Sequence, residues 1–260
     1  MSNYLLYKHK DKSRQIYSHI KKYIMQSLYY SQIYENKFKF ILENKRFSKR
    51  VLNLNHNGAL LPKKQINDSF FMIFDEFKPI LKKYIPKKSL IHFPIIIRLN
   101  NSLANIKNKY SSKHPHLDSW AGQPIQSRIL SFNVFSTRTS PTLEILKLKK
   151  KIKIPLSKQK KYKGVVNIKD CKSLYKSKTG DVLITGPGVL HKTSEGKSFR
   201  VTLECRFVKE KHVSKKDEKK FLNFYFSNKK FFNISKKNTL ITTPFNSIAK
   251  SRFGVDFKFK

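Results

Sequence analysis

The sequence contains little cysteine and few acidic residues. Only two of its 260 residues are cysteine, Cys171 and Cys205, and they form no CxxC pair. We therefore expect neither a disulfide framework nor a structural zinc site. Position 205 falls in a strand-like run, so a buried thiol is expected there.

Long apolar runs are also absent. No stretch approaches the roughly 18 apolar residues of a transmembrane helix, and the N-terminal MSNYLLYKHKDKSRQ has no apolar signal core. We therefore expect a cytoplasmic protein with no membrane span. The sequence leaves its oligomeric state open.

The shortage of acidic residues produces a large positive charge. Sixteen Asp and Glu face 56 Lys and Arg, which gives a net charge of +40, and only nine of the basic residues are arginine. Lys, Asn and Ile are the residues that an AT-rich coding sequence favours. This usage favours compositional drift over a polyanion-binding surface, because groove-binding proteins are expected to use more arginine. The hydrophobic content of 39% still allows a sizeable core.

Two regions before residue 93 have helical patterns. Residues 1–57 contain no glycine or proline, and apolar residues recur there at helical spacing from Ile16 to Leu28. This predicts one or two amphipathic helices up to about Leu54. The segment 67–85 opens with good N-cap residues and predicts a second helical region, with Pro79 as a kink or break.

From residue 93 the pattern changes to short strands. The predicted strands are 93–100, 128–135, 164–168, 180–186 and 199–207. The last one alternates strictly between apolar and polar residues, so Arg200, Thr202, Glu204 and Arg206 share one face. The pattern favours an α+β architecture with a β-sandwich or barrel core.

The domain organisation follows from these changes in pattern. We expect an N-terminal helical region over 1–92 packed on a core of residues 93–207. A lysine- and phenylalanine-rich extension over 208–260 is expected to be a helical or irregular cover. The lysine-dense runs within 147–178 are expected to be exposed strand edges or loops. The whole is interpreted as one compact domain.

The stretch 114-HPHLDSW-120 carries potential metal ligands. In an extended chain His116 and Asp118 point the same way, and His114 has the same parity. His191 ends the glycine-bounded GDVLITGPGVLH. Two histidines and one carboxylate on one side of an ion leave three coordination positions open, as in non-haem Fe(II) oxygenases. A keto acid bound there would need a cationic partner, which Arg200 can supply.

The ordered set HxD…GDxLxxxxxxxH…RxT resembles the iron(II)- and 2-oxoglutarate-dependent dioxygenases. Residues 180-GDVLITGPGVLHKTSEGKSFRVTLECRF-207 resemble the phytanoyl-CoA dioxygenase group. HLDSWAGQP resembles the related streptomycin-biosynthesis (StrG-like) proteins. The resemblance covers roughly residues 93–207, under half of the chain.

This resemblance implies a double-stranded β-helix (jelly-roll, cupin-like) core with the helices packed on it. It implies that His116, Asp118 and His191 bind Fe(II), and that Arg200, assisted by Thr202, anchors 2-oxoglutarate. The implied activity is a hydroxylation that uses O₂ and a small, possibly anionic, metabolite, and converts 2-oxoglutarate to succinate and CO₂.

Other polar and aromatic residues have open roles. Asn133 could hold the C1 carboxylate of 2-oxoglutarate or be an ordinary satisfied amide. Trp120, the only tryptophan, could line the substrate pocket or pack in the core. Arg128 and Arg98 are candidates for an anionic substrate. Glu204 and Arg206 could pair with each other.

Two alternative functions remain. An AlkB-type nucleic-acid demethylase would also carry HxD…H, with Arg200 and Arg206 at an R-x5-R spacing, which makes nucleic acid a possible but not favoured partner. A metal-binding jelly-roll protein without redox chemistry is the other. The substrate cannot be identified from the sequence.

Overall fold

The protein combines helices with antiparallel β-sheets. The computed structural model describes residues 4–27, 59–60, 67–101, 111–150, 153–213, 225–241 and 257–259. Most of the helical prediction for the segment up to Leu54 therefore lies outside the described residues.

The described elements divide into helices, two main sheets and a separate strand pair. The helices are α1 (Lys10–Ser27), α4 (Asn67–Tyr84) and α6 (Asn228–Asn233), with 3-10 turns η3 (Asp118–Ala121), η4 (Ile168–Asp170) and η5 (Glu210–His212). The larger sheet contains β1 (Tyr4–Lys8), β2 (Ala59–Leu60), β3 (Ser89–His92), β4 (Ile96–Asn101), β5 (Arg128–Ser136), β8 (Asp181–Thr185), β10 (Phe199–Lys209) and β11 (Tyr225–Ser227). The smaller sheet contains β6 (Leu143–Leu148), β7 (Cys171–Lys176) and β9 (His191–Thr193), and β12 (Thr239–Ile241) pairs with β13 (Phe257–Phe259).

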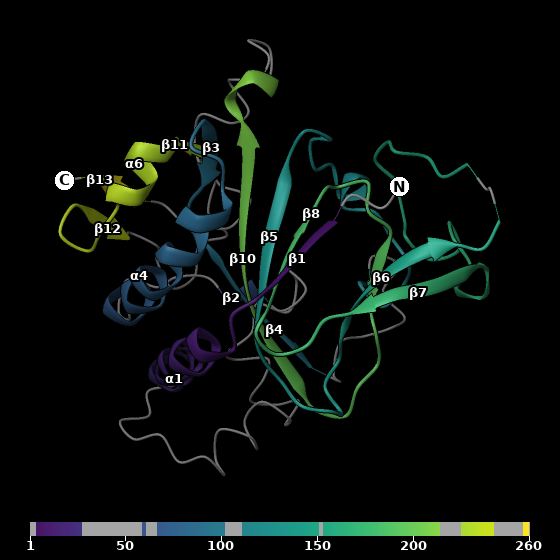
Figure 1. Ribbon diagram of the computed structural model, residues 1–260, viewed down its shortest axis with the longest axis horizontal. Coiled ribbons are helices and arrows are strands. Elements are labelled where there is room, and N and C mark those ends of the chain that lie inside the picture. The colour runs from purple at the N-terminus through teal and green to yellow at the C-terminus, as the bar shows by residue number, and fades with distance from the viewer. Residues whose placement is uncertain are drawn as a thin grey trace.

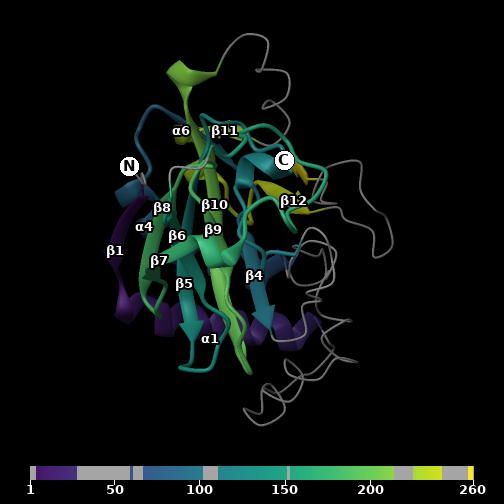
Figure 2. The same cartoon turned by 90° about the vertical axis from the view of Figure 1, so that its right-hand side faces the viewer.

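Strand β10 is the centre of the larger sheet. It pairs with β5 along most of its length on one side, and with β4 and then β3 on the other. Figure 2 shows β10 running between β5 and β4. The sheet continues from β5 through β8 to β1. All of these pairings are antiparallel, so the strands predicted at 128–135, 180–186 and 199–207 are confirmed.

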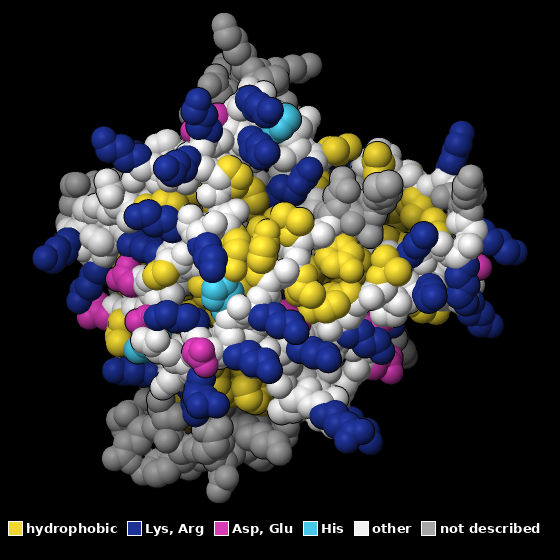
Figure 3. Space-filling view, in the orientation of Figure 1, with side chains coloured by type: hydrophobic (Ala, Val, Ile, Leu, Met, Phe, Trp, Pro, Cys, Tyr) yellow, Lys and Arg dark blue, Asp and Glu magenta, His cyan; other side chains and the backbone are white. Residues whose placement is uncertain are grey.

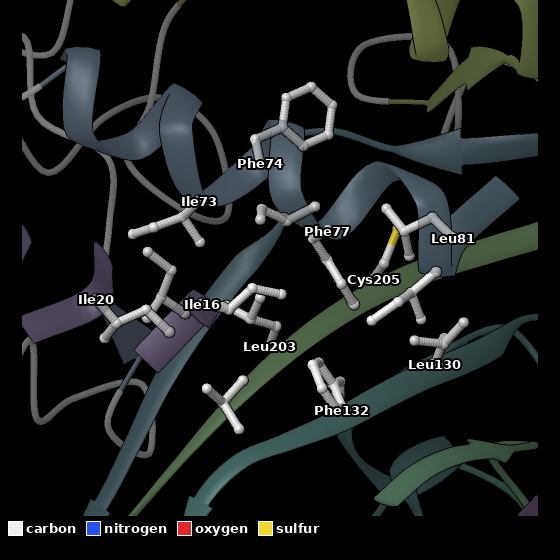
Figure 4. Packing of buried hydrophobic residues seen from close by; sticks show 14 of the residues in the cluster. Ile16, Ile20, Ile73, Phe74, Phe77, Leu81, Leu130, Phe132, Leu203 and Cys205 are labelled. Atoms are coloured by element: carbon white, nitrogen blue, oxygen red, sulfur yellow. The ribbon is translucent and has the colours of Figure 1, made fainter. Parts of the chain in front are cut away.

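The larger sheet has helices on one face and the smaller sheet toward the other (Figure 1). Helices α1 and α4 contribute Ile16 and Phe77 to one continuous core, which also holds Phe132 of β5 and the odd-numbered residues of β10 from Phe199 to Phe207. Figure 4 shows these side chains meeting between the helices and the sheet. Cys205 lies in this core as a buried free thiol, as predicted.

The opposite face of the sheet is polar although it is largely buried. The even-numbered residues of β10 alternate with the core residues, so they point away from the helices. Arg200 and Thr202 are both almost completely buried there. Their neighbours across the strand pairs include Asn100 and Asn133. A buried polar face needs partners, and the smaller sheet lies on this side (Figure 1).

The N-terminus differs from its prediction. Residues Tyr4–Lys8 form strand β1, paired with β8 at the edge of the larger sheet, and α1 begins only at Lys10. Gly180, in the turn before β8, allows the chain between β1 and α1 to pass close to it. Its φ is +87°, and a Cβ at this position would lie 3.0 Å from the Cα of Lys10. A side chain would therefore be disfavoured both by backbone conformation and by space.

Two further predictions are corrected. Helix α4 continues through Pro79, so the proline does not break the helix, and the burial of Phe77 and Leu81 stabilises it despite the missing backbone hydrogen bond; the alternative of a kink stays a prediction. Residues 164–168 form a turn and not a strand. Gly164 has a φ of +82°, and the side chain of Asn167 accepts a hydrogen bond from the Lys169 N–H, which starts η4.

The C-terminal extension contains more strand than expected. Residues 225–227 form β11 on β3, α6 follows directly, and β12 pairs with β13. Within the part of the chain that the structure describes, no helix is both long and apolar enough to cross a membrane. Lysine and arginine side chains are spread over the visible face of the molecule (Figure 3).

The packing of α4 on the sheet can be tested with Phe77→Ala. The Phe77 ring is fully buried and lies 6.1 Å from the ring of Phe132, stacked at 12°. Its truncation should lower the free energy of unfolding by about 3–5 kcal/mol, measured by urea denaturation. Met72→Ala is the matched control on the same helix, because Met72 is 41% exposed. The control should change stability by less than ~0.5 kcal/mol, and equal losses would contradict this packing.

Candidate metal centre

A backbone bridge brings two distant histidines together. The His116 N–H donates to the His191 carbonyl at 2.9 Å, and the His191 N–H donates back to the His116 carbonyl at 3.0 Å. His191 begins β9, and β9 pairs with β6. The main chain of His116 is therefore fixed to the edge of the smaller sheet, independently of its side chain.

Asp118 is positioned by the short turn that follows. Leu117 is extended and buried, and η3 begins at Asp118. The Ser119 N–H donates to the Pro187 carbonyl at 3.0 Å, which ties the turn to the loop before His191. Gly122 closes the turn with a φ of +81°, and its N–H donates to the Ser119 carbonyl. Because Leu117 is extended, His116 and Asp118 lie on the same side of the chain.

The three side chains form a compact group with metal-ligand geometry. Ligand atoms of His116, Asp118 and His191 all lie within 4.8 Å of one another. The His191 Nε2 is 3.9 Å from an Asp118 carboxylate oxygen. Two imidazoles and one carboxylate are donors that suit a first-row divalent metal ion.

Both imidazoles are oriented by backbone carbonyls. The Nδ1 of His116 lies 2.8 Å from the His114 carbonyl, and the Nδ1 of His191 lies 2.8 Å from the Val189 carbonyl. A carbonyl can only accept, so each Nδ1 carries a proton, and Nε2 is the nitrogen that each ring can offer to an ion. Carbonyls that hold a ring in this way are the usual outer contacts of metal-binding histidines.

The charges around the group favour its ligating form. Burial, helped by the charge of His191, lowers the pKa of His116 to about 3, so its ring is neutral near pH 7. Burial alone would raise the pKa of Asp118, but the neighbouring His191, His116, Arg206 and Arg98 together lower it. A neutral imidazole and an ionised carboxylate need no deprotonation before they bind a cation.

The structure separates His114 from His116. His114 contributes its backbone carbonyl to the ring of His116, and its side chain is not part of the three-residue group. The sequence alone could not distinguish them, since both have the same parity. Their difference arises from the backbone bridge, which is made by His116 and not by His114.

Arg200 is a buried cation with spare donors. Its side chain is only 3% exposed, and Nη2 donates to the Asn100 side-chain oxygen at 3.0 Å. Within the described residues, its Nε and Nη1 have no hydrogen-bond partner. Burial lowers the pKa of Arg200 to about 10, which still leaves it charged at neutral pH.

Two further buried polar atoms lie on the same face. Thr202 and Asn133 are opposite each other in the β10–β5 pairing. The Thr202 hydroxyl and the Asn133 side-chain oxygen are buried and have no hydrogen-bond partner among the described residues. The Asn133 amide nitrogen donates to Ser136 and Ser177. Buried polar atoms of this kind are normally satisfied by ordered water or by a ligand.

Glu204 pairs with Arg98 on the neighbouring strand. The Arg98 Nε and Nη2 each lie 2.8 Å from one oxygen of the Glu204 carboxylate, which is a bidentate ion pair. The pairing expected between Glu204 and Arg206 is therefore not the main contact of this carboxylate. Arg98 was predicted as a residue that could bind an anionic substrate, but its guanidinium already binds the Glu204 carboxylate.

Arg128 and Trp120 have contacts away from the three-residue group. Arg128 is in phase with the core residues Leu130 and Phe132 of β5, not with the polar face of the sheet, and its guanidinium donates to the Ser127 carbonyl at 2.8 Å. The indole of Trp120 is 1% exposed, and its N–H donates to the Pro155 carbonyl at 2.6 Å. These are the contacts of packing residues. Their predicted roles in substrate binding remain predictions.

Two residues with contacts at the site were not predicted. Tyr162 stacks on His116, and Asn100 accepts from Arg200. Tyr162 lies among lysines in a segment that was interpreted as exposed, so no local signal marked it. Asn100 ends a predicted strand, and its alignment with Arg200 depends on the β4–β10 register.

Comparisons with known proteins give distant matches. No protein-family model and no curated protein matches the sequence. Among solved structures, the non-heme monooxygenase ThoJ in its apo form is 10% identical, with a TM-score of 0.43 over 80% of this chain and 74% of that chain. Its nickel complex is 8% identical, with a TM-score of 0.39 over the same shares. EvdMO1 is 12% identical, with a TM-score of 0.42 over 80% of this chain and 48% of that chain. At this distance the functional argument depends on the site itself.

The Arg98–Glu204 pair can be tested with Glu204→Gln. The two side chains are 16% and 15% exposed, so removing one charge leaves the other buried. The free energy of unfolding should fall by about 3–5 kcal/mol near pH 7. Asp75→Asn, which breaks the more exposed pair with Lys78, is the control and should cost less than ~1 kcal/mol.

The effect of Glu204→Gln should depend on pH. Burial alone would raise the pKa of Glu204, but Arg98 outweighs it, and the pKa is lower than the ordinary value of 4.5. The stabilisation is therefore complete above 4.5 and is lost as the pH falls through the lower folded-state value. Denaturation curves of both proteins should converge in acid. A difference that persists unchanged at low pH would contradict the ion pair.

Proposed function

We propose that the protein is an Fe(II)- and 2-oxoglutarate-dependent oxygenase that hydroxylates a small molecule. The observation that carries this proposal is the combination of a two-histidine, one-carboxylate group with a buried arginine that has unused donors. The proposed fold of the core is a double-stranded β-helix, which is consistent with two antiparallel sheets on either side of the site.

The metal would be held by His116, Asp118 and His191. Their donor set leaves positions open on the ion, which suits non-haem Fe(II) enzymes that bind a co-substrate and O₂. The ligands come from two segments joined by backbone hydrogen bonds, which would hold the ligands near one another independently of an ion. A site of this kind binds metal with little cost in ordering the chain.

The co-substrate would be held by Arg200, Thr202 and Asn133. Glu204 stabilises the buried charge of Arg200 without a direct hydrogen bond to it, and a carboxylate that accepts from Nε and Nη1 would stabilise it further. The Thr202 hydroxyl could donate to the same anion, and the Asn133 amide lies on the adjacent strand. The polar atoms that the protein leaves unsatisfied therefore match a dicarboxylate such as 2-oxoglutarate.

When bound, Fe(II) and 2-oxoglutarate supply the activation of O₂, with overall conversion of 2-oxoglutarate, O₂ and substrate to succinate, CO₂ and hydroxylated substrate. The protein contributes binding and orientation. His114 and Val189 fix the imidazole rings through their carbonyls. The ring of Tyr162 and the neighbouring apolar side chains keep water away from His116.

Metal binding can be tested by anaerobic titration with Co(II) or Fe(II). The wild-type protein should bind one ion per chain, and His191→Ala should abolish tight binding because one of three ligands is lost. His114→Ala is the matched control, because its side chain is not one of the three grouped ligands and its backbone carbonyl is kept. It should bind metal like the wild type. Equal loss in both variants would contradict the ligand assignment.

Binding of the co-substrate can be tested with Arg200→Gln. Titration of the Fe(II)-loaded protein with 2-oxoglutarate, followed by the visible charge-transfer band of the chelate, should give a Kd increased roughly 100-fold. This loss of affinity is expected because removing one partner of a buried charge pair costs about 2–5 kcal/mol. Arg138→Gln, at an exposed position, is the control. Metal binding should be unchanged in both variants.

The same variant separates two explanations of the buried arginine. If Arg200 is kept for a ligand, its removal should not destabilise the protein without ligand, because a buried and incompletely hydrogen-bonded charge is lost. A large loss of stability would indicate a structural role.

A metal-binding protein without redox chemistry would bind Co(II) but form no succinate with any substrate offered.

A further inference from the structure

Residues 153–167, here called the cover segment, lie against the candidate metal centre. The Trp120 indole N–H donates to the Pro155 carbonyl at 2.6 Å, and the Gln159 N–H donates to the Trp120 carbonyl at 3.2 Å. Trp120 belongs to η3, the turn that begins with Asp118. The cover segment is therefore fastened to the same turn that carries a proposed metal ligand.

Tyr162 is the residue of this segment that reaches the site. Its ring lies 4.8 Å from the ring of His116 and is parallel to it within 5°. It is 6% exposed, and it packs in a cluster that also contains Leu117, Trp120 and Val166. The ring of Tyr162 thus occupies one face of the His116 imidazole.

This contact adds a parallel stacking restraint to the His116 ring, which also meets the ring of His191 at 4.3 Å and 53°. The second side-chain torsion of histidine has broad minima, so one hydrogen bond at Nδ1 allows the ring to rock about it. A flat ring stacked on its face limits that rocking. A metal ligand whose lone pair is already aimed binds with less loss of side-chain freedom.

We propose that Tyr162 is a positioning residue for metal binding, and that it couples the cover segment to the occupancy of the metal centre. The proposal rests on the proposed function only in requiring that His116 binds a metal ion. Residues that orient metal-binding histidines change metal affinity by about 10–100-fold when they are mutated. We expect the lower end of this range, since the Nδ1 hydrogen bond of His116 is retained.

The coupling must act in both directions. If the stacked Tyr162 raises the affinity for metal, bound metal must favour the stacked state of the cover segment by the same factor. The segment carries Lys158, Lys160, Lys161 and Lys163, all of which are exposed. Trypsin cleavage at these lysines therefore reports how often the segment leaves the site.

The decisive comparison is Tyr162→Leu against Tyr162→Phe. Both fill part of the apolar cluster, but only phenylalanine retains a flat ring. Titrated with Co(II) alone, Tyr162→Leu should show a Kd about 10-fold higher than the wild type, and a changed absorption spectrum of the bound ion. Tyr162→Phe should match the wild type. Tyr225→Ala, which removes a tyrosine packed against His92 far along the larger sheet, should also match.

Limited trypsin digestion, followed by mass spectrometry, gives an independent measurement. Co(II) should slow cleavage between residues 158 and 163 in the wild type and in Tyr162→Phe, but not in Tyr162→Leu. Trp120→Phe, which removes the donor to Pro155 and part of a buried ring, should increase cleavage without metal. This second variant tests the segment even if Tyr162→Leu folds poorly.

The outcomes are distinguishable from those of the proposed function. A wild-type protein that fails to bind Co(II) overturns the metal centre itself. Wild-type binding that both Tyr162 variants retain, with cleavage slowed equally, overturns the role of Tyr162. Equal weakening in both variants would assign the effect to the hydroxyl group and would also overturn the stacking argument.

Discussion

The strict alternation of β10 is the constraint on which the rest of the structure depends. Its odd-numbered side chains join the helices in one apolar core, and its even-numbered side chains face the other way. A shift of one residue in register would exchange the two sets completely. The core therefore fixes which side chains are available to the site. The hydrophobic effect positions a buried polar surface that it would not itself stabilise.

The parts of the fold and site that could be predicted have strong local patterns. The alternation of β10 identified the face of Arg200 and Thr202, and the two-residue spacing placed His116 with Asp118. The choice between His114 and His116 needed His191, 75 residues away, and the structure explains this dependence. Local sequence gives both histidines the same direction, whereas the bridge to His191 involves only one.

The parts that could not be predicted depend on tertiary contacts. The five residues of β1 have no clear alternation, and their strand exists because β8 offers a free edge. The apolar residues at 164–168 resemble a strand, but Gly164 and Asn167 impose a turn. Tyr162 reaches His116 from the cover segment, which hydrogen bonds to Trp120 fasten to η3. None of these contacts produces a periodic pattern in the sequence.

The main-chain bridge between His116 and His191 separates the scaffold of the site from its chemistry. Two N–H···O=C bonds join the segments, and neither bond involves a side chain. A cysteine or an aspartate substituted at either position would project from the same fixed backbone point, with its ligand atom closer to the main chain. The preference for one metal over another can therefore change during evolution by single substitutions, because the pairing of the two segments does not depend on these side chains.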